Sequence, residues 1–475
     1  MQDFKYYLEK TGEVGEVVEV LDSMVYVKGL PKTKPSELVI FENGSFGQAF
    51  SLAEDYVEIL LFSIDGMKPG IRVARTDDFL KVSVGGHLLG KVIGPLTKAD
   101  GEMRPVDSEP LSIFARVPAR KPFETGVSIV DLVTPLAKGQ RELVIGDRRT
   151  GKTVFLLQTI LNQAQKGTIC VYAAIGKKKV DVRKAEEYFV THGIDKKIVT
   201  VATSSADPSG LIFLTPYAAM TIAEYFRDKG QDVLVVLDDL TTHAKFYREI
   251  SLLAKRFPGR SSYPGDIFFT HSKLLERAGN FKEASITCLP VAETVLGDLS
   301  GYIQTNLMAM TDGHIFFDSE LANLGRRPAI NPFLSVTRVG GQAQTPLLRE
   351  ASRQLSKFLV HHRKLQEFMH FGAELGEEVK RDLNLGDRIT ALFDQKPNMV
   401  FPQNVSLILF AGIWAGLFRE VEIKDLKKQI EAVISSYGAD AAYRKNVDVL
   451  ISGAKTFADL ISLVKKNSQL LLTNG

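Results

Sequence analysis

The chain has 475 residues, more than a single hydrophobic core serves, so roughly two to four domains are expected. Hydrophobic residues make up 45% and charged residues 24%, the balance of a soluble globular protein. A net charge of +3 is close to neutral for this length, and it speaks against a nucleic-acid-binding surface.

Cysteine usage and hydropathy exclude two further classes of protein. Cys170 and Cys288 stand in apolar surroundings, which predicts buried free thiols and not a disulfide framework. The opening residues are polar and lack the apolar core of a signal peptide. The longest apolar run, 405–418, is shorter than the roughly 20 residues of a membrane span. It predicts a buried helix, and membrane association only through partner subunits.

Residues 1–80 have the pattern of short antiparallel strands. Apolar and polar residues alternate at 18–20 and 25–28, and glycine and proline separate the runs. This region is predicted to form a small β-barrel.

Residues 81–353 alternate continuous apolar runs with helical stretches. The runs 143–145, 169–175 and 233–237 are typical of strands buried on both faces of a parallel sheet, so an α/β domain is expected.

Residues 354–475 are predicted to be helical. Ile423, Leu426, Ile430 and Val433 recur at helical spacing, as do Phe457, Leu460, Ile461 and Val464, which indicates core-facing stripes of a helical bundle.

A phosphate-binding loop follows the first apolar run of the α/β region. The segment fits the pattern G-x-x-x-x-G-K-[ST] and reads Gly146, Asp147, Arg148, Arg149, Thr150, Gly151, Lys152, Thr153. The glycines let backbone N–H groups turn toward phosphate oxygens, Lys152 can reach the phosphates, and the Thr153 hydroxyl can ligate Mg²⁺. The segment follows a strand and opens a helix, which is the context that this motif requires.

A second motif ends the apolar run 233–237. Asp238 is expected at the C-terminal tip of a central strand, where its carboxylate can hold the water shell of a magnesium ion. Together the two motifs predict a site for a Mg-nucleoside triphosphate, Mg-ATP being one such ligand, with Thr153 and Asp238 as the residues next to the metal ion.

The segment 139–153 closely resembles the phosphate-loop segment of α subunits of F-type rotary ATP synthases. The resemblance extends from about residue 13 to 420, and it is carried further by segments 237–240, 247–253, 258–260, 263–266, 271–277, 311–313, 327–331 and 335–340. It implies an N-terminal β-barrel, a central P-loop (RecA-like) α/β domain and a C-terminal helical bundle. It also implies an alternating hetero-hexamer with β-type catalytic subunits around a central rotor shaft.

The resemblance further implies that this chain binds nucleotide without hydrolysing it. Catalytic relatives carry a glutamate that activates water, in the turn after the strand that follows the phosphate-loop helix. Lys177 stands at that position here, and a lysine cannot take a proton from water at neutral pH. Family α subunits usually have glutamine at the positions of Lys177 and Arg149. Two interpretations of Lys177 stay open, a solvated lysine in a basic run or a direct contact to phosphate.

Arg338 matches the arginine that α subunits insert into the neighbouring catalytic site. A guanidinium suits the spread negative charge of a phosphoryl group in transfer. Ser335 accompanies it and is expected to fix the loop. The alternative for Arg338 is an ordinary structural salt bridge.

Arg327, Pro328 and Gln395 match the part of α subunits that encloses the adenine. A second glutamine of the family pattern is missing, and Pro397 stands near its position. The stretch before the barrel is short, whereas family members have a longer helix there that contacts the peripheral stalk. The resemblance places the chain at the cytoplasmic face of a bacterial membrane, held there by its partners.

Three other functions compete with that of a nucleotide-binding subunit. A self-sufficient export or vacuolar-type catalytic ATPase needs the carboxylate that Lys177 replaces. An RNA-translocating hexamer needs aromatic or basic surfaces that the N-terminal strand pattern lacks. A structural pseudo-subunit without nucleotide is the third, kept open by Lys177, Arg149 and Pro397.

Overall fold

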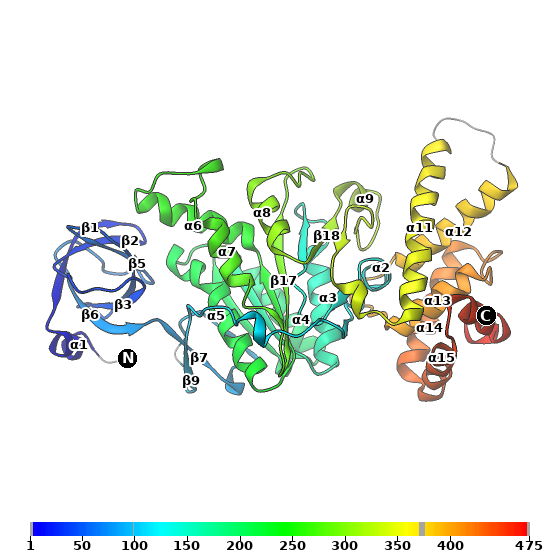
Figure 1. The fold of residues 1–475 in the computed structure, drawn as a ribbon, viewed down its shortest axis with the longest axis horizontal. Helices are drawn as coiled ribbons and strands as arrows, with labels where there is room; N and C mark the ends of the chain where they lie inside the picture. The colour runs from blue at the N-terminus through cyan, green and yellow to red at the C-terminus, as the bar shows by residue number, and fades with distance from the viewer. Residues whose placement is uncertain (1–2, 98, 370–375, 473–475) are drawn as a thin grey trace. The chain divides into compact units, whose positions relative to one another are not determined.

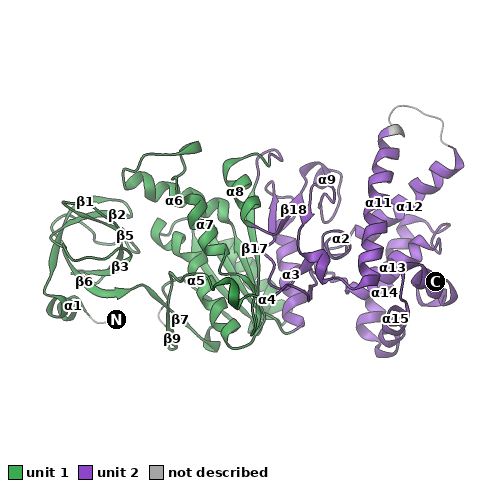
Figure 2. Cartoon of the chain, in the orientation of Figure 1, with its two compact units in different colours: residues 1–117, 167–293, 299–310 green, residues 118–166, 294–298, 311–475 purple. Residues whose placement is uncertain are grey.

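The computed structural model describes residues 3–97, 99–369 and 376–472 (Figure 1). By internal contacts the chain divides into two compact units (Figure 2). Unit 1 comprises 1–117, 167–293 and 299–310, and unit 2 comprises 118–166, 294–298 and 311–475. This division runs through the predicted α/β region, so the two limits between the three predicted domains, at 80/81 and 353/354, stay a prediction.

The N-terminal part of unit 1 is a closed six-stranded β-barrel, as the alternating pattern predicts. All neighbouring strands pair antiparallel, in the order β1-β2-β5-β4-β3-β6. The strands are β1 (Val14–Leu21), β2 (Met24–Lys28), β3 (Glu37–Phe41), β4 (Phe46–Leu52), β5 (Val57–Leu61) and β6 (Arg72–Phe79). Inward-facing valine, isoleucine, leucine and phenylalanine side chains fill the barrel, which closure leaves without a free edge.

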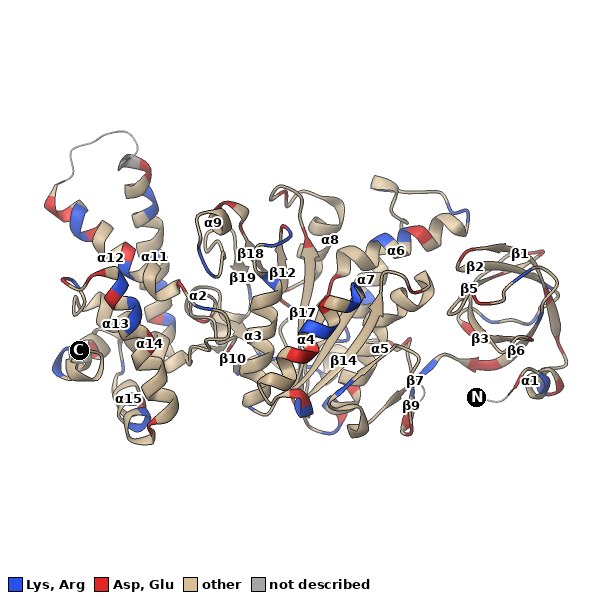
Figure 3. Ribbon diagram, turned by 180° about the vertical axis from the view of Figure 1, so that it is seen from behind, with Lys and Arg blue, Asp and Glu red and all other residues tan. Residues whose placement is uncertain are grey.

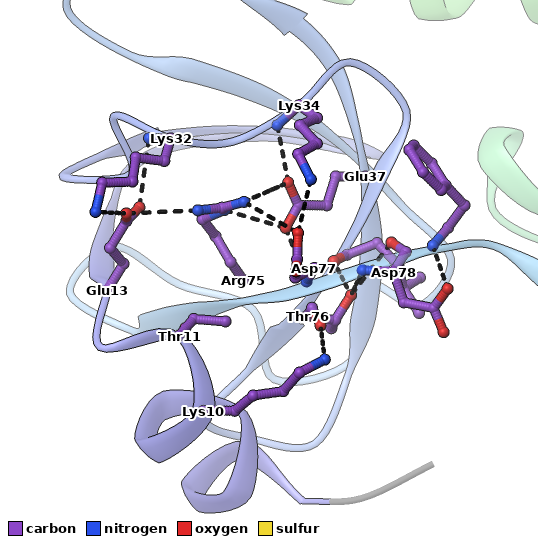
Figure 4. A network of polar contacts seen from close by, with 12 residues as sticks. Lys10, Thr11, Glu13, Lys32, Lys34, Glu37, Arg75, Thr76, Asp77 and Asp78 are labelled. Carbon is purple, nitrogen blue, oxygen red and sulfur yellow. Dashed lines mark hydrogen bonds and ion pairs between the residues drawn. The ribbon is translucent and has the colours of Figure 1, made fainter.

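A short helix, α1 (Phe4–Thr11), precedes the barrel and packs against β6. The Asp3 carboxylate caps it by accepting a hydrogen bond from the Tyr6 N–H at 2.9 Å. Gly12 ends it with φ of 65°, a conformation that glycine adopts without steric cost. The Lys10 ammonium also donates to the Thr76 carbonyl at 3.0 Å, so the helix is tied to the barrel wall (Figure 4).

A buried charge network closes the end of the barrel next to α1 (Figure 4). Both Arg75 and Glu37 are buried, and the Arg75 Nε and Nη2 atoms each donate to the Glu37 carboxylate at 3.1 Å. Glu13 and Asp77 add acceptors at 3.4 and 3.7 Å. Each buried charge therefore has a partner of opposite sign, the condition for such groups to be tolerated inside a barrel.

Replacing Arg75 with alanine is expected to lower the free energy of unfolding of unit 1 by about 3 kcal/mol, because Glu37 would stay buried without a counterion. The matched control is Arg72→Ala, since Arg72 makes a solvent-exposed pair with Glu42 whose loss matters far less. Urea unfolding of both variants, followed by circular dichroism, measures the difference. Equal midpoints for the two variants would contradict the expectation.

The remainder of unit 1 is built on a five-stranded parallel sheet in the order β17-β15-β13-β14-β8. Its strands are β8 (Lys91–Ile93), β13 (Ile169–Lys177), β14 (Ile198–Ser204), β15 (Val233–Asp238) and β17 (Ser285–Glu293), with β16 (Gly279–Asn280) antiparallel on β17. A separate antiparallel pair is formed by β7 (Lys81–Val84) and β9 (Glu102–Pro105). The sheet is accompanied by helices α4 (Lys179–Thr191), α5 (Ser209–Asp228), α6 (Leu240–Leu253), α7 (Ile267–Leu275) and α8 (Tyr302–Met310). The runs predicted as buried strands are β13 and β15. Cys170 and Cys288 are buried and are not joined in a disulfide, as predicted.

Two buried histidines join α6 to α7. The His243 Nε2–H donates to the Phe213 carbonyl at 3.1 Å, so its Nδ1 accepts from the His271 Nε2–H at 3.0 Å. This arrangement requires the His243 ring to be neutral, because its Nδ1 must accept a hydrogen bond. Burial lowers the pKa of His243 to about 4 and places that of His271 well below its usual value.

Unit 1 is therefore expected to lose stability as the pH falls from about 6.5, the unfolded pKa of histidine, toward 4. In that window the unfolded state binds protons that the folded state cannot take up, at a cost of about 3 kcal/mol for His243 alone. The His243→Gln variant keeps a side-chain amide for the carbonyl but does not titrate, so its urea midpoint should depend less steeply on pH. A parallel pH dependence of parent and variant would contradict this.

One group of strands in unit 2 comprises β12 (Leu143–Gly146), β18 (Gly313–Phe317) and β19 (Val336–Thr337). The first two pair parallel, and β19 pairs antiparallel with β18. Strands β10 (Pro122–Phe123) and β11 (Leu136–Ala137) pair antiparallel with each other and form a separate two-stranded sheet. The helices that accompany these strands are α2 (Ser128–Val133), α3 (Lys152–Gln165), α9 (Ser319–Asn323) and α10 (Gly340–Ala343).

The C-terminal part of unit 2 is helical, as the apolar stripes predict. Its helices are α11 (Pro346–Met369), α12 (Glu377–Phe393), α13 (Gln403–Trp414), α14 (Ile423–Ala439), α15 (Ala441–Gly453) and α16 (Phe457–Lys466). Helix α13 is the apolar run foreseen as a buried helix, and nine of its residues are buried. Leu426, Ile430 and Val433 of α14 face inward, as do Phe457, Leu460 and Val464 of α16. Over the described residues, none of the helices combines the length and apolarity needed to cross a bilayer.

Charged side chains of both signs are interspersed on the exposed helices, most visibly on α4 and α12 (Figure 3). Such mixing is typical of a solvated surface and differs from the one-signed stripe of a nucleic-acid-binding face.

Candidate nucleotide-binding site

The phosphate loop lies in unit 2, between β12 and α3, in the strand-turn-helix context that the sequence predicts. Two glycines shape it. A Cβ on Gly146 would lie 2.3 Å from the Phe317 carbonyl oxygen, and Gly151 has φ of 103°. Arg149 adopts φ of 65°, which continues the curl of the backbone. Helix α3 begins at Lys152, within the motif, so its positive N-terminal end adds to an anion-binding concavity.

The Lys152 ammonium is held against the backbone of the loop. It donates to the carbonyls of Gly146 at 2.7 Å and Asp147 at 2.6 Å, and Lys152 is buried. The Thr150 hydroxyl donates to the same Asp147 carbonyl at 2.8 Å. The loop thus keeps its shape through its own side chains. The residues Arg148, Arg149 and Thr153 are exposed around it.

The Asp147 side chain serves the scaffold, although the motif placed it among the nucleotide contacts. Its carboxylate accepts from the hydroxyls of Thr294 and Ser319 at 2.5 Å each and from the Gly297 N–H at 3.0 Å. Burial alone would raise the pKa of Asp147, but the donors from Ser319 and Thr294 outweigh it and hold the pKa below its usual value. Only the backbone of this residue is left to face a phosphate.

Asp238, in unit 1, ends β15 as predicted and is buried together with Asp239. The Lys177 Nζ atom, from the end of β13, lies 2.6 Å from Asp238 Oδ1 and 3.3 Å from Asp239 Oδ2. The Tyr172 hydroxyl donates to Asp238 Oδ2 at 2.9 Å. The prediction of a merely solvated Lys177 is therefore wrong, because the side chain is ion-paired with two buried carboxylates.

Electrostatics keeps Lys177 charged. Burial alone would lower the pKa of its ammonium, but Asp238 and then Asp239 outweigh burial and raise the pKa above its usual value. The lysine therefore cannot act as the base that activates water.

The geometry at Asp238 does not fit a magnesium ion. Both of its oxygens are engaged, one by Lys177 and one by Tyr172. The Asp239 carboxylate is likewise engaged, by the Thr242 N–H at 2.6 Å and the Thr242 hydroxyl at 3.0 Å. Mg²⁺ needs near-octahedral oxygen ligands, directly or through water, and an ammonium already stands against these oxygens. Among the residues that the structure describes, no cluster of three histidine, cysteine or acidic side chains is suited to a metal.

Arg338 follows β19 in unit 2 and is exposed. Its backbone N–H donates to the Asp312 carbonyl at 2.9 Å, and its Nη1 lies 3.5 Å from the Thr311 carbonyl oxygen. Within the described part of the chain the guanidinium has no salt bridge. Burial raises the pKa of the Glu142 carboxyl, and the charge of Arg338 has the smaller, opposite effect on that pKa.

The loop around Arg338 is fixed by the hydroxyl groups of Ser335, which is buried, and Thr337, which is partly buried. Ser335 donates to the Asn331 carbonyl at 2.7 Å and accepts from the Phe316 N–H at 3.0 Å. Thr337 donates to the Pro135 carbonyl at 2.9 Å and accepts from the Gln140 amide at 3.1 Å. Ser335 thus holds the loop, as expected, whereas the role of Thr337 was missed because a hydroxyl residue carries no signal of its partner.

Arg327 and Gln395 come together in unit 2, where the Gln395 N–H donates to the Arg327 carbonyl at 2.6 Å. The side-chain amide of Gln395 is buried, and it donates to the carbonyls of Gly126 and Met399 and accepts from the Ser128 N–H. Both hydrogens of the Gln395 amide are therefore donated to groups of the protein.

A pocket of about 200 Å³ adjoins Arg327 and Gln395 and is lined by Arg327, Ala391, Asp394, Gln395, Lys396, Pro397, Met399, Phe401, Lys427, Ile430 and Glu431. Pro328 follows Arg327 and is half-buried.

Comparison with known proteins agrees with this architecture. The model of the ATP synthase alpha/beta family, nucleotide-binding domain, matches residues 126–337, and the model of the ATP synthase alpha/beta chain, C terminal domain, matches residues 344–459. ATP synthase subunit alpha of Clostridium acetobutylicum is 39% identical over 450 residues, which cover 92% of this chain and 88% of that relative. The barrel, the α/β region and the helical C-terminal part are the fold expected from the resemblance, and the chain belongs to the ATP synthase alpha/beta family.

Proposed function

We propose that this chain is a non-catalytic, nucleotide-binding α-type subunit of a proton- or sodium-coupled ATP synthase. It binds adenine nucleotide at the phosphate loop and works in an alternating hexamer with β-type subunits, around a rotor shaft and beside a peripheral stalk. The complex lies at the cytoplasmic face of a bacterial membrane, which this chain reaches through its partners. The similarity to a subunit alpha over nearly the whole chain supports this assignment.

The observation that carries the non-catalytic role is the ion pair of Lys177 with Asp238. Hydrolysis needs a group that accepts a proton from water or orients it. A charged lysine tied at 2.6 Å to a carboxylate does neither. The same observation disfavours a self-sufficient export or vacuolar-type ATPase.

We propose further that Arg338 reaches the catalytic site of an adjacent β-type subunit, with Ser335 holding its loop. The exposed guanidinium and the bonded loop backbone support this role. For the base, the Arg327 and Pro328 segment and the pocket beside Gln395 are the proposed contacts. The side-chain amide of Gln395 is already hydrogen-bonded to other groups of the protein. Its proposed contribution to base binding is therefore the shape that it gives to the pocket. The sequence-based assignment of Mg²⁺ to Thr153 and Asp238 stays a prediction that the geometry of Asp238 does not favour.

The test is to measure nucleotide binding and ATP turnover with the purified chain alone. We expect ADP and ATP to bind, binding to be lost in Lys152→Gln, and turnover to be absent until a β-type subunit is added. Turnover by the isolated chain would overturn the non-catalytic assignment. Absence of binding in a folded protein would favour the structural pseudo-subunit.

A further inference from the structure

The pocket beside Gln395 and the phosphate loop both belong to unit 2, and helix α3 connects them. The helix begins at Lys152 of the loop. Six residues later, the Gln158 side-chain amide donates to the carbonyl of Met399, which lines the pocket, at 2.5 Å. Six residues of α-helix span roughly 9 Å, and the base and the phosphates of a nucleotide, joined by one ribose, lie a comparable distance apart. The loop and the pocket can therefore hold the two ends of one nucleotide.

The side-chain amide of Gln395 is not available to distinguish one base from another. It donates to the Gly126 carbonyl at 2.7 Å and to the Met399 carbonyl, and it accepts from the Ser128 N–H at 3.1 Å. A side-chain amide can select a base only by turning its donor or its acceptor toward that base. Turning this buried amide would leave polar groups of the protein unpaired in the interior, which is costly. Other residues must therefore contact the hydrogen-bonding edge of the base.

Two pairs of opposite charge also line the pocket. The Lys427 ammonium donates to the Asp394 carboxylate, and the two side chains are 42% and 27% exposed. Lys396 and Glu431 form a second pair at 2.6 Å, which is more exposed. The less exposed pair is screened less by water, so it interacts more strongly with a bound molecule. Lys427 and Asp394 thus present a donor and an acceptor side by side.

A donor beside an acceptor matches either purine. Adenine has an amino group, a donor, next to the acceptor N1, whereas guanine has the acceptor O6 next to the donor N1–H. An ammonium only donates and a carboxylate only accepts, so Lys427 and Asp394 can each find a partner on both bases. The two purines present donor and acceptor in opposite order, and the flexible, half-exposed side chain of Lys427 can follow that exchange. Both bases can therefore make the same number of hydrogen bonds to the pair.

We propose that the base pocket of this chain accepts adenine and guanine nucleotides alike, with Lys427 and Asp394 as the residues that bind the edge of the base. The inference rests on the proposed nucleotide binding and extends the ligand class from adenine nucleotides to purine nucleotides.

The test is to titrate the purified full-length chain with ADP and with GDP by isothermal calorimetry, first for the parent and then for Lys427→Met. The dissociation constants of the parent should differ by less than about threefold. Lys427→Met leaves Asp394 alone, which can still accept from two donors of guanine, whereas N1 of adenine loses its donor. The ratio of the two dissociation constants should therefore shift about fivefold toward GDP.

Two further variants separate contact with the base from a general loss of stability, which would weaken ADP and GDP binding alike. Lys427→Gln keeps a donor at the same position and should keep the ratio of the parent. Lys428→Met removes an exposed lysine that pairs with Asp425 and does not line the pocket, and it is the matched control. Its ratio should also equal that of the parent. If Lys427→Met does not fold, the ratio measured for the parent still decides whether both bases are accepted.

A parent that prefers either base by more than about threefold, or a ratio that Lys427→Met does not change, would overturn the inference while leaving nucleotide binding intact. Failure of a folded parent to bind either nucleotide is a different result, because it overturns the proposed nucleotide binding as well.

Discussion

Replacing Arg338 with alanine is expected to lower ATP turnover of the assembled complex by a factor of about 10³–10⁵. In the proposed role, the variant loses a planar, permanently charged donor to the phosphoryl group in the neighbouring subunit. Nucleotide binding by the isolated chain should not change, because the contacts that the structure describes for this exposed guanidinium, to the Thr311 carbonyl and to the charge of Glu142, lie outside the phosphate loop. Steady-state turnover and ADP titration measure the two effects separately.

Two controls separate this role from a structural one. Arg338→Lys keeps the charge but loses the two-pronged geometry, so it should recover only a small part of the turnover. Arg353→Ala removes an exposed arginine of α11 and should leave turnover unchanged. An Arg338→Ala complex that assembles and turns over normally would remove Arg338 from the catalytic site.

The bonding of the loop explains why the effect should be large. Arg338 itself is exposed, but the residues before it are tied to β18 and to the segment that precedes β12. The backbone that carries the side chain does not have to be ordered during the reaction, so more of the interaction of Arg338 with the transition state lowers the barrier.

Most of the fold could be predicted because apolar residues recur in the sequence with clear strand-like or helix-like spacing. Continuous apolar runs became β12, β13 and β15, and the stripe through Leu426, Ile430 and Val433 became the buried face of α14. These patterns are local, and each reports how many faces of an element are buried. Helix α1 was not foreseen, although Asp3 and Gly12 mark its ends.

The contacts of the site residues could not be predicted, because they join positions far apart in the chain. Lys177 and Asp239 are 62 residues apart and meet only because β13 pairs with β15. The motif names Asp147 but does not say that Thr294 and Ser319 bind its carboxylate. Similarly, the resemblance identifies Gln395 without revealing that its amide is spent on Gly126 and Met399. A motif specifies a backbone shape, whereas partners depend on the tertiary structure.

The two glycines of the phosphate loop should respond differently to the same substitution. Gly146→Ala is expected to cost about 4 kcal/mol, the sum of an unfavourable backbone conformation and an overpacked contact. The added Cβ would lie 2.3 Å from the Phe317 carbonyl oxygen and 2.7 Å from its Cβ. Strand β18 would have to shift, and Phe317 would take Phe155 of α3 with it, since their ring centroids lie 5.7 Å apart. Loss of nucleotide binding should follow, because β12 and α3 flank the loop.

Gly151→Ala isolates the conformational part of this effect. Gly151 has φ of 103°, but a Cβ there would meet no atom within 4 Å, so only about 1–2 kcal/mol of backbone strain is expected. Urea midpoints and ADP affinities of the two variants, measured side by side, separate the steric contact from the backbone strain. Equal losses of stability and ADP affinity in Gly151→Ala and Gly146→Ala would contradict this explanation. The steric contact between β12 and β18 would then not be the reason for a glycine at position 146.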